Sequence, residues 1–113
     1  MGGDIMIDIL SNNLFHAINT KNQKLLDYLI DDDCILMNFD DKSVLGKNKV
    51  ICQLNNTYNG CQIDMLNHVK DDKDTSLIAY KLIGAELPKF GSLVIKQNVK
   101  KKICFVKNII IQE

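Results

Sequence analysis

The sequence predicts a single α+β domain in which three helices come first and an antiparallel sheet follows. Apolar residues recur at steps of three and four in the first part of the chain, which is the spacing of one helix face. After Gly60 this period gives way to the alternation of apolar and polar residues that is typical of strands. One proline and six glycines are too few to form a linker, so we expect residues 1–113 to form one domain.

Composition supports a folded globular chain and excludes several classes of partner. Hydrophobic residues make up 46% and charged residues 25% of the sequence, close to the average for soluble domains. Fourteen lysines balance fourteen acidic residues, so we expect neither a nucleic-acid nor a membrane partner. Arginine is absent, which excludes chemistry that needs a guanidinium. No apolar run approaches the ~20 residues of a membrane span, and we expect a cytoplasmic location.

Two helices are expected to open the chain. Residues 4–19 carry apolar side chains on one helical face. These side chains are Met6, Ile9, Leu10, Leu14, Ala17 and Ile18. Residues 20–22 break the pattern, and a second, short helix follows, which we expect to end at the three aspartates of residues 31–33. Its apolar positions are Leu25, Leu26, Leu29 and Ile30.

A hairpin and a third helix come next. Residues 34–39 are a compact apolar run of strand length, residues 40–42 read as a turn, and residues 43–45 as a second strand. Gly46 separates this hairpin from a third helix of about 11 residues. The helical spacing is carried by Val50, Ile51, Leu54 and Tyr58. Asn59 and Gly60 are typical turn residues and end this helix.

Four further strands complete the predicted sheet. We place them at residues 61–70, 75–87, 92–100 and 103–112, and the short polar turns between them favour antiparallel pairing. In the first, one face is predicted to carry Cys61, Ile63, Met65 and Val69, and the other Gln62, Asp64, His68 and Lys70. The last strand is apolar on both faces, which indicates that both are covered.

Motifs for catalysis and metal binding are weak. His16 and His68 lie on different elements, so we expect no metal site, and no cofactor motif is present. Asp64 and His68 share a predicted strand face; an exposed pair is the simplest interpretation, and acid–base catalysis is the alternative. No Cys-x-x-Cys spacing occurs, so we interpret the cysteines as small buried residues, with redox or metal chemistry left open. They are Cys34, Cys52, Cys61 and Cys104.

The opening half resembles nuclear transport factor 2-like proteins, which include ketosteroid isomerases. The matching residues are the segment 14–22, then Leu25, Leu26, Leu29, Asp32, Asp33, Cys34, Gly46 and Lys47. This resemblance implies a cystatin-like α+β roll, in which three helices pack in a strongly curved mixed or antiparallel sheet that forms a cone. It also implies an apolar pocket between the sheet and the third helix, and a homodimer that forms through the sheet.

The catalytic groups of that superfamily are not retained. Ketosteroid isomerases place a tyrosine on the first helix, an aspartate base on the first strand and a protonated aspartate on a later strand. By position these groups correspond to Leu14, Asn38 and Ile95, none of which can abstract a proton near neutral pH. We therefore expect no ketosteroid isomerase activity. The missing arginine also excludes the Asp-Arg-Asp set of the epoxide-hydrolysing relatives.

Three functions follow as hypotheses. The first is a protein of unassigned activity that binds a small apolar metabolite in the pocket, because a few polar groups in an apolar cavity are typical of a ligand site. The predicted lining is Leu14, Asn38, Tyr58, Tyr80, Ile95 and Gln97. The second is a homodimeric protein-interaction module. The third is an isomerase or hydrolase with a non-standard acid–base set, Asp64 and His68.

Overall fold

The elements follow one another in the predicted order. A computed structural model describes residues 2–38, 42–84 and 89–111. Its elements are α1 (Gly2–Thr20), α2 (Gln23–Leu29), β1 (Ile30–Met37), β2 (Ser43–Leu45), α3 (Lys47–Thr57), β3 (Gln62–Asp72), β4 (Thr75–Ile83), β5 (Lys89–Gln97) and β6 (Ile103–Ile111). Three helices and two short strands therefore precede four long strands, which confirms the α+β class. Within these described ranges no helix is both long and apolar enough to cross a membrane.

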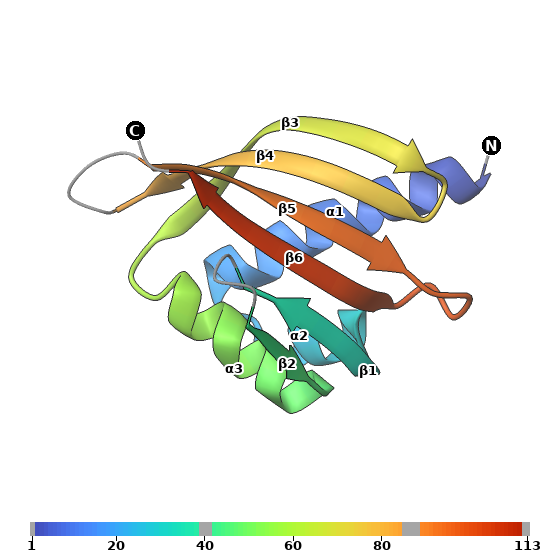
Figure 1. Ribbon diagram of the computed structural model, residues 1–113, viewed down its shortest axis with the longest axis horizontal. Coiled ribbons are helices and arrows are strands. Elements are labelled where there is room, and N and C mark those ends of the chain that lie inside the picture. The colour runs from blue at the N-terminus through green and yellow to red at the C-terminus, as the bar shows by residue number, and fades with distance from the viewer. Residues whose placement is uncertain (1, 39–41, 85–88, 112–113) are drawn as a thin grey trace.

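All six strands belong to one mixed sheet. Their spatial order is β2-β1-β6-β5-β4-β3, and neighbouring strands are antiparallel except β1 and β6, which are parallel. The sheet curls without closing, and α1 passes behind β4, β5 and β6 in Figure 1. The sheet therefore has an inner face toward the helices and an outer face that is turned to the viewer.

The core lies between α1 and the inner face of the sheet. Four of the apolar residues predicted for the buried face of the first helix are buried, together with Phe15. They are Leu10, Leu14, Ala17 and Ile18. Ile9, which was predicted on the same face, is exposed. Leu10 and Leu14 are one helical turn apart and form the stripe that faces the sheet, and Ile9 lies beside this stripe.

The start of β1 corrects two predictions. Ile30 was assigned to the second helix and residues 31–33 to a turn, but α2 ends at Leu29 and all four residues belong to the strand. Ile30 has extended dihedrals and lies opposite Ile103 of β6. The aspartates themselves fall in a register shift between two paired positions, since the next residue of β1 to pair with β6 is Ile35, opposite Phe105. Pairing on both sides of residues 31–33 therefore keeps them in the strand, despite the weak strand propensity of aspartate.

Other boundaries differ by a few residues. β5 begins at Lys89, because Phe90 and Gly91 pair with β4, where a turn was predicted. β3 continues to Asp72, so the turn before β4 is shorter than expected. The predicted strand positions 39 and 85–87, and turn positions 40, 41 and 88, lie outside the described residues.

A β-bulge in β3 reverses the alternation on which its faces were predicted. Met65 lies opposite Tyr80, but Asn67 lies opposite Ala79, so Leu66 is an extra residue on β3. Beyond the bulge, Val69 pairs with Leu77 on the outer face instead of following Met65 inward. The prediction that Val69 shares a face with Met65 is therefore wrong, because one inserted residue shifts a period of two by one.

Gly91 gives the ring of Tyr80 its place on the inner face. The two residues are direct cross-strand partners. A Cβ atom on Gly91 would lie 2.6 Å from the Tyr80 hydroxyl oxygen and 2.8 Å from the backbone oxygen of Ile109. Only the absence of a side chain lets the phenol pack against the backbone here.

We expect Gly91→Ala to lower the free energy of unfolding by about 1–3 kcal/mol, because either the Tyr80 ring or the β6 backbone must move. Urea denaturation followed by circular dichroism measures the change. Ser92→Ala is the matched control, since Ser92 lies opposite Ala79 on the outer face. Equal stability of the two variants would contradict the close packing of Tyr80 against Gly91.

Candidate functional site

Five of the six residues predicted to line a pocket are buried within the roll. Leu14 comes from α1, Tyr58 follows α3, Tyr80 lies on β4, and Ile95 and Gln97 lie on β5. The sixth, Asn38, follows β1 and is half-buried, and its backbone N–H donates to the carbonyl of Lys42. Gln97 donates to the Asp74 carboxylate and to the Lys73 carbonyl, so its amide group binds the turn between β3 and β4.

The two tyrosines form a buried hydrogen-bonded chain with Asn108 of β6. The Tyr58 hydroxyl donates to the Tyr80 hydroxyl at 3.2 Å, and the Tyr80 hydroxyl donates to the Asn108 side-chain oxygen at 3.0 Å. Phe15 packs edge-on against the Tyr80 ring, and Tyr58 does the same. Burial raises the pKa of both phenols, so the chain carries no charge at neutral pH.

Asn108 was not among the site residues predicted from the sequence. Its signal is a single amide within the apolar strand β6, at a position opposite Leu93 of β5. A polar residue on the buried face of a strand needs a partner, and Tyr80 supplies one. The partner lies on β4, so the pair could not be recognised without the sheet register.

The predicted lining residues fill their own space. The exposed fractions are 0% for Leu14 and Ile95, 1% for Tyr80, 2% for Tyr58 and 4% for Gln97. A cavity that admits a ligand leaves accessible surface on the side chains that border it. These five side chains therefore enclose no ligand-sized space in this conformation, and any ligand would have to displace an aromatic ring.

Asp64 and His68 point to opposite faces of the sheet. Asp64 lies opposite Lys81 on the outer face and is exposed, whereas His68 lies opposite the fully buried Ile78 on the inner face. The bulge at Leu66 separates them. The prediction that the two side chains share a face is wrong, and the acid–base pair of the third hypothesis is not assembled.

The cysteines occupy different environments. Cys34 is buried, Cys61 and Cys104 are half-buried, and Cys52 is exposed, so the prediction of burial is wrong for Cys52. All four thiols are free. Burial raises the pKa of the Cys34 thiol to about 12. Among the residues that the structure describes, no three His, Cys, Asp or Glu side chains converge as metal ligands would.

We expect Cys52 to react with Ellman's reagent in the native protein and Cys34 to react only after unfolding, because the thiolate is the nucleophile. Since the pKa of Cys34 is raised from 9.0 to about 12, its contribution to stability is complete below pH 9 and is lost between pH 9 and 12. Thermal unfolding at about pH 8 to 11 should therefore show a shallower alkaline loss in Cys34→Ala. Rapid labelling of Cys34 at pH 8 would contradict its burial.

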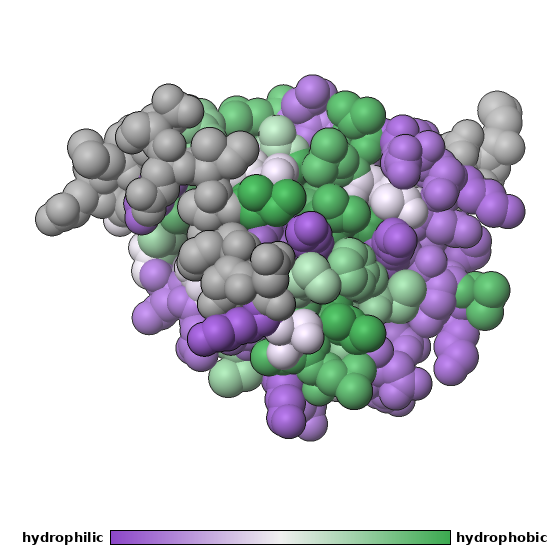
Figure 2. Space-filling model, in the orientation of Figure 1, coloured by the Kyte–Doolittle hydropathy of each residue, from purple (hydrophilic) through white to green (hydrophobic). Residues whose placement is uncertain are grey.

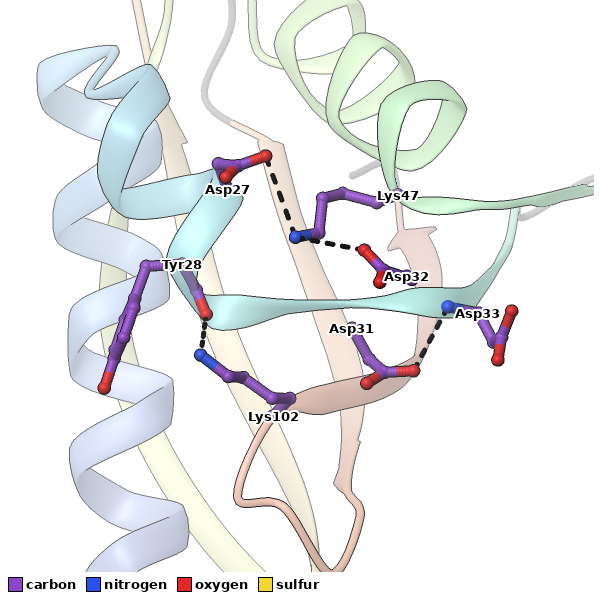
Figure 3. A network of polar contacts seen from close by, with 7 residues as sticks. All are labelled: Asp27, Tyr28, Asp31, Asp32, Asp33, Lys47 and Lys102. Carbon is purple, nitrogen blue, oxygen red and sulfur yellow. Dashed lines mark hydrogen bonds and ion pairs between the residues drawn. The ribbon is translucent and has the colours of Figure 1, made fainter.

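A polar cluster joins the beginnings of β1 and α3 at the surface. The Lys47 ammonium group lies 3.3 Å from Asp32 and 3.7 Å from Asp27 (Figure 3). Lys102 donates to the carbonyl of Tyr28 at 2.6 Å and lies over its ring. A depression of about 470 Å³ lies beside Lys47. The carboxylates of Asp27 and Asp32 are largely exposed, so their ion pairs with Lys47 contribute little to stability. The pairs position α3 against β1.

The outer face of the sheet carries a patch of exposed apolar side chains. Val69, Leu77 and Val94 lie opposite one another on β3, β4 and β5, and Val69 and Leu77 are 51% and 42% exposed. Ala79 and Ile109 adjoin them on the same face. We call these five residues the outer apolar patch. Figure 2 shows apolar side chains gathered over the middle of this face.

No known family model and no curated protein sequence matches the chain, but many solved structures share its fold. A proposed ketosteroid isomerase from Kribbella flavida DSM 17836 superposes with a TM-score of 0.86 at 13% identity, over 97% of this chain and 81% of that chain. A cystatin-like protein from Silicibacter pomeroyi DSS-3 gives 0.80 at 13% identity, over 90% and 73%.

An NTF2-like protein of unknown function from Exiguobacterium sp. 255-15 gives a TM-score of 0.75 at 13% identity, over 92% of this chain and 99% of that chain. These similarities extend along most of both chains in each comparison. The chain therefore has the nuclear transport factor 2-like, cystatin-like fold that the resemblance in its opening half implied.

Proposed function

We propose that this nuclear transport factor 2-like domain is a protein-interaction module that forms a homodimer through the outer apolar patch. The observation that carries the proposal is the aligned row of the exposed Val69 and Leu77 and the half-buried Val94 on a continuous sheet face. Contiguous exposed apolar surface marks interaction sites, and two sheets pack face to face at about 10 Å. Pairing would remove this surface from water.

The β3 edge of the sheet is a poorer surface for pairing than its outer face. Asn19 of α1 donates to the carbonyl of Ile63 and accepts from its N–H, both at 2.8 Å, so its amide occupies this stretch of β3. The N–H of His68 is bonded by the side chain of Asn67 at 2.8 Å. The bulge at Leu66 further disrupts a regular edge. Such features oppose the addition of a further strand at this edge. The outer face is therefore the better surface for pairing.

We expect the wild-type chain to have twice its 12.8 kDa mass in light scattering at about 100 µM. Leu77→Lys should weaken the dimer at least about ten-fold, because an unpaired ammonium group would be buried at the interface. Val99→Lys is the control, since Val99 is exposed in the turn between β5 and β6. A monomeric wild type at that concentration, or equal dimers of both variants, would contradict the proposal.

Binding of a small apolar ligand inside the roll is a second candidate function. It is supported by the chain of Tyr58, Tyr80 and Asn108, which places hydroxyl and amide groups among aromatic rings. These groups can orient one polar end of an otherwise apolar molecule. Because the described side chains fill the space, the ligand would replace the contact between Phe15 and Tyr80.

For this candidate we expect phenol and indole to raise the melting temperature of the wild-type chain, and Tyr80→Phe to reduce the shift because the hydroxyl chain is broken. Tyr28→Phe, at an exposed tyrosine, is the matched control. A loss of the shift in both variants alike, or no shift in the wild type, would count against a ligand site at Tyr80.

A further inference from the structure

The charges of this chain are unevenly distributed, although they balance overall. No aspartate or glutamate occurs from residue 89 to residue 112, a segment that contains β5, β6 and the turn between them. Its lysines are Lys89, Lys96, Lys100, Lys101, Lys102 and Lys107. Since the whole chain has no net charge, the rest of the molecule is acidic. The β5–β6 hairpin is therefore a cationic element in an otherwise anionic domain.

Two of these lysines lie among apolar side chains on the outer face. Lys107 of β6 lies between Val94 of β5 and Met37 of β1, and Lys96 of β5 lies opposite Phe105. Lys96 and Lys107 are diagonal neighbours, which places them roughly 7–8 Å apart. We call this pair the lysine stripe.

The ammonium groups of the stripe are not neutralised by the chain itself. Lys96 lies over the Phe105 ring at 5.6 Å from its centroid. In the part of the chain that the structure describes, neither Lys96 nor Lys107 forms an ion pair. Apolar surface continues past the stripe to the exposed Ile35 on β1 and Leu45 on β2.

We propose that the lysine stripe and its apolar neighbours bind an acidic amphipathic segment of another protein, in which carboxylates alternate with apolar side chains. Carboxylates would pair with Lys96 and Lys107 while apolar side chains contact Phe105 and Ile35. A second copy is a poorer occupant, because a two-fold axis over β6 would bring Lys107 against Lys107 of the other copy. The surface adjoins the outer apolar patch, because Val94 of that patch lies opposite Lys107.

A nucleic acid is also a poorer occupant of this surface. The chain has no arginine for bidentate phosphate contacts, and the stripe is bordered by apolar side chains instead of further lysines. Apolar neighbours favour a polypeptide that has apolar side chains of its own.

The test uses a fluorescein-labelled peptide of alternating Asp and Leu, with a matched peptide in which Asn replaces Asp. Anisotropy with the full chain should show the acidic peptide binding at least about ten-fold more tightly, with a difference that shrinks as salt is raised. Lys96→Glu/Lys107→Glu should abolish this preference. Lys24→Glu/Lys49→Glu, which changes the net charge equally at exposed positions on α2 and α3, should retain it.

Further measurements separate this inference from its alternatives. Leu77→Gln/Val69→Gln, which removes apolar side chains of the outer apolar patch on β3 and β4, should not weaken peptide binding even if dimerisation is lost. Equal binding of both peptides, or equal loss in the two double-charge variants, would overturn the proposal. Equally tight binding of a single-stranded oligonucleotide would also overturn it, because the surface would then recognise anions in general. Circular dichroism verifies that each variant is folded.

Discussion

The parallel pairing of β1 with β6 connects the two halves of this chain. Ile30 lies opposite Ile103 and Leu36 opposite Val106, and all four side chains are buried. This contact joins the helical half to the long strands, and it extends the antiparallel sheet of β3 to β6 by two strands. The apolar surface that runs from β6 onto β1 and β2, and the part of the core that β1 covers, depend on it.

The polar groups buried at the inner face of the sheet are neutral. Tyr58, Tyr80 and Asn108 satisfy one another through hydrogen bonds within an apolar core. Such a buried network is stable when its members are paired, and it offers no ionised group for proton transfer at neutral pH. Gly91 makes the arrangement possible because it leaves room for the Tyr80 ring. Packing and mutual hydrogen bonding therefore explain why these three polar side chains are buried.

The outer face combines two kinds of surface on neighbouring strands. The outer apolar patch lies over β3 to β6, whereas the lysine stripe lies on β5 and β6 and continues toward apolar residues on β1 and β2. Apolar surface supplies most of the driving force for association, and unpaired charges decide which partners are tolerated. The two surfaces meet where Val94 lies opposite Lys107.

Local patterns in the sequence were sufficient for the element order and for most helix positions. The spacing of Leu10, Leu14 and Ala17 correctly predicted the buried face of α1, and the change of period after Gly60 correctly predicted the long strands. The resemblance in the opening half indicated the right fold. It also placed Leu14 and Ile95 at interior positions of the superfamily, and both side chains are buried.

What the sequence by itself determined is thus the set of amphipathic elements, because helix and strand periods are local properties. Only the tertiary structure decided that residues 31–33 are strand, that Val69 faces outward, and that Asp64 and His68 point apart. Each of these depends on cross-strand register, which is set by a partner far away in the sequence. A single bulge at Leu66 is enough to reverse the faces of the side chains from Asn67 to Lys70 in β3.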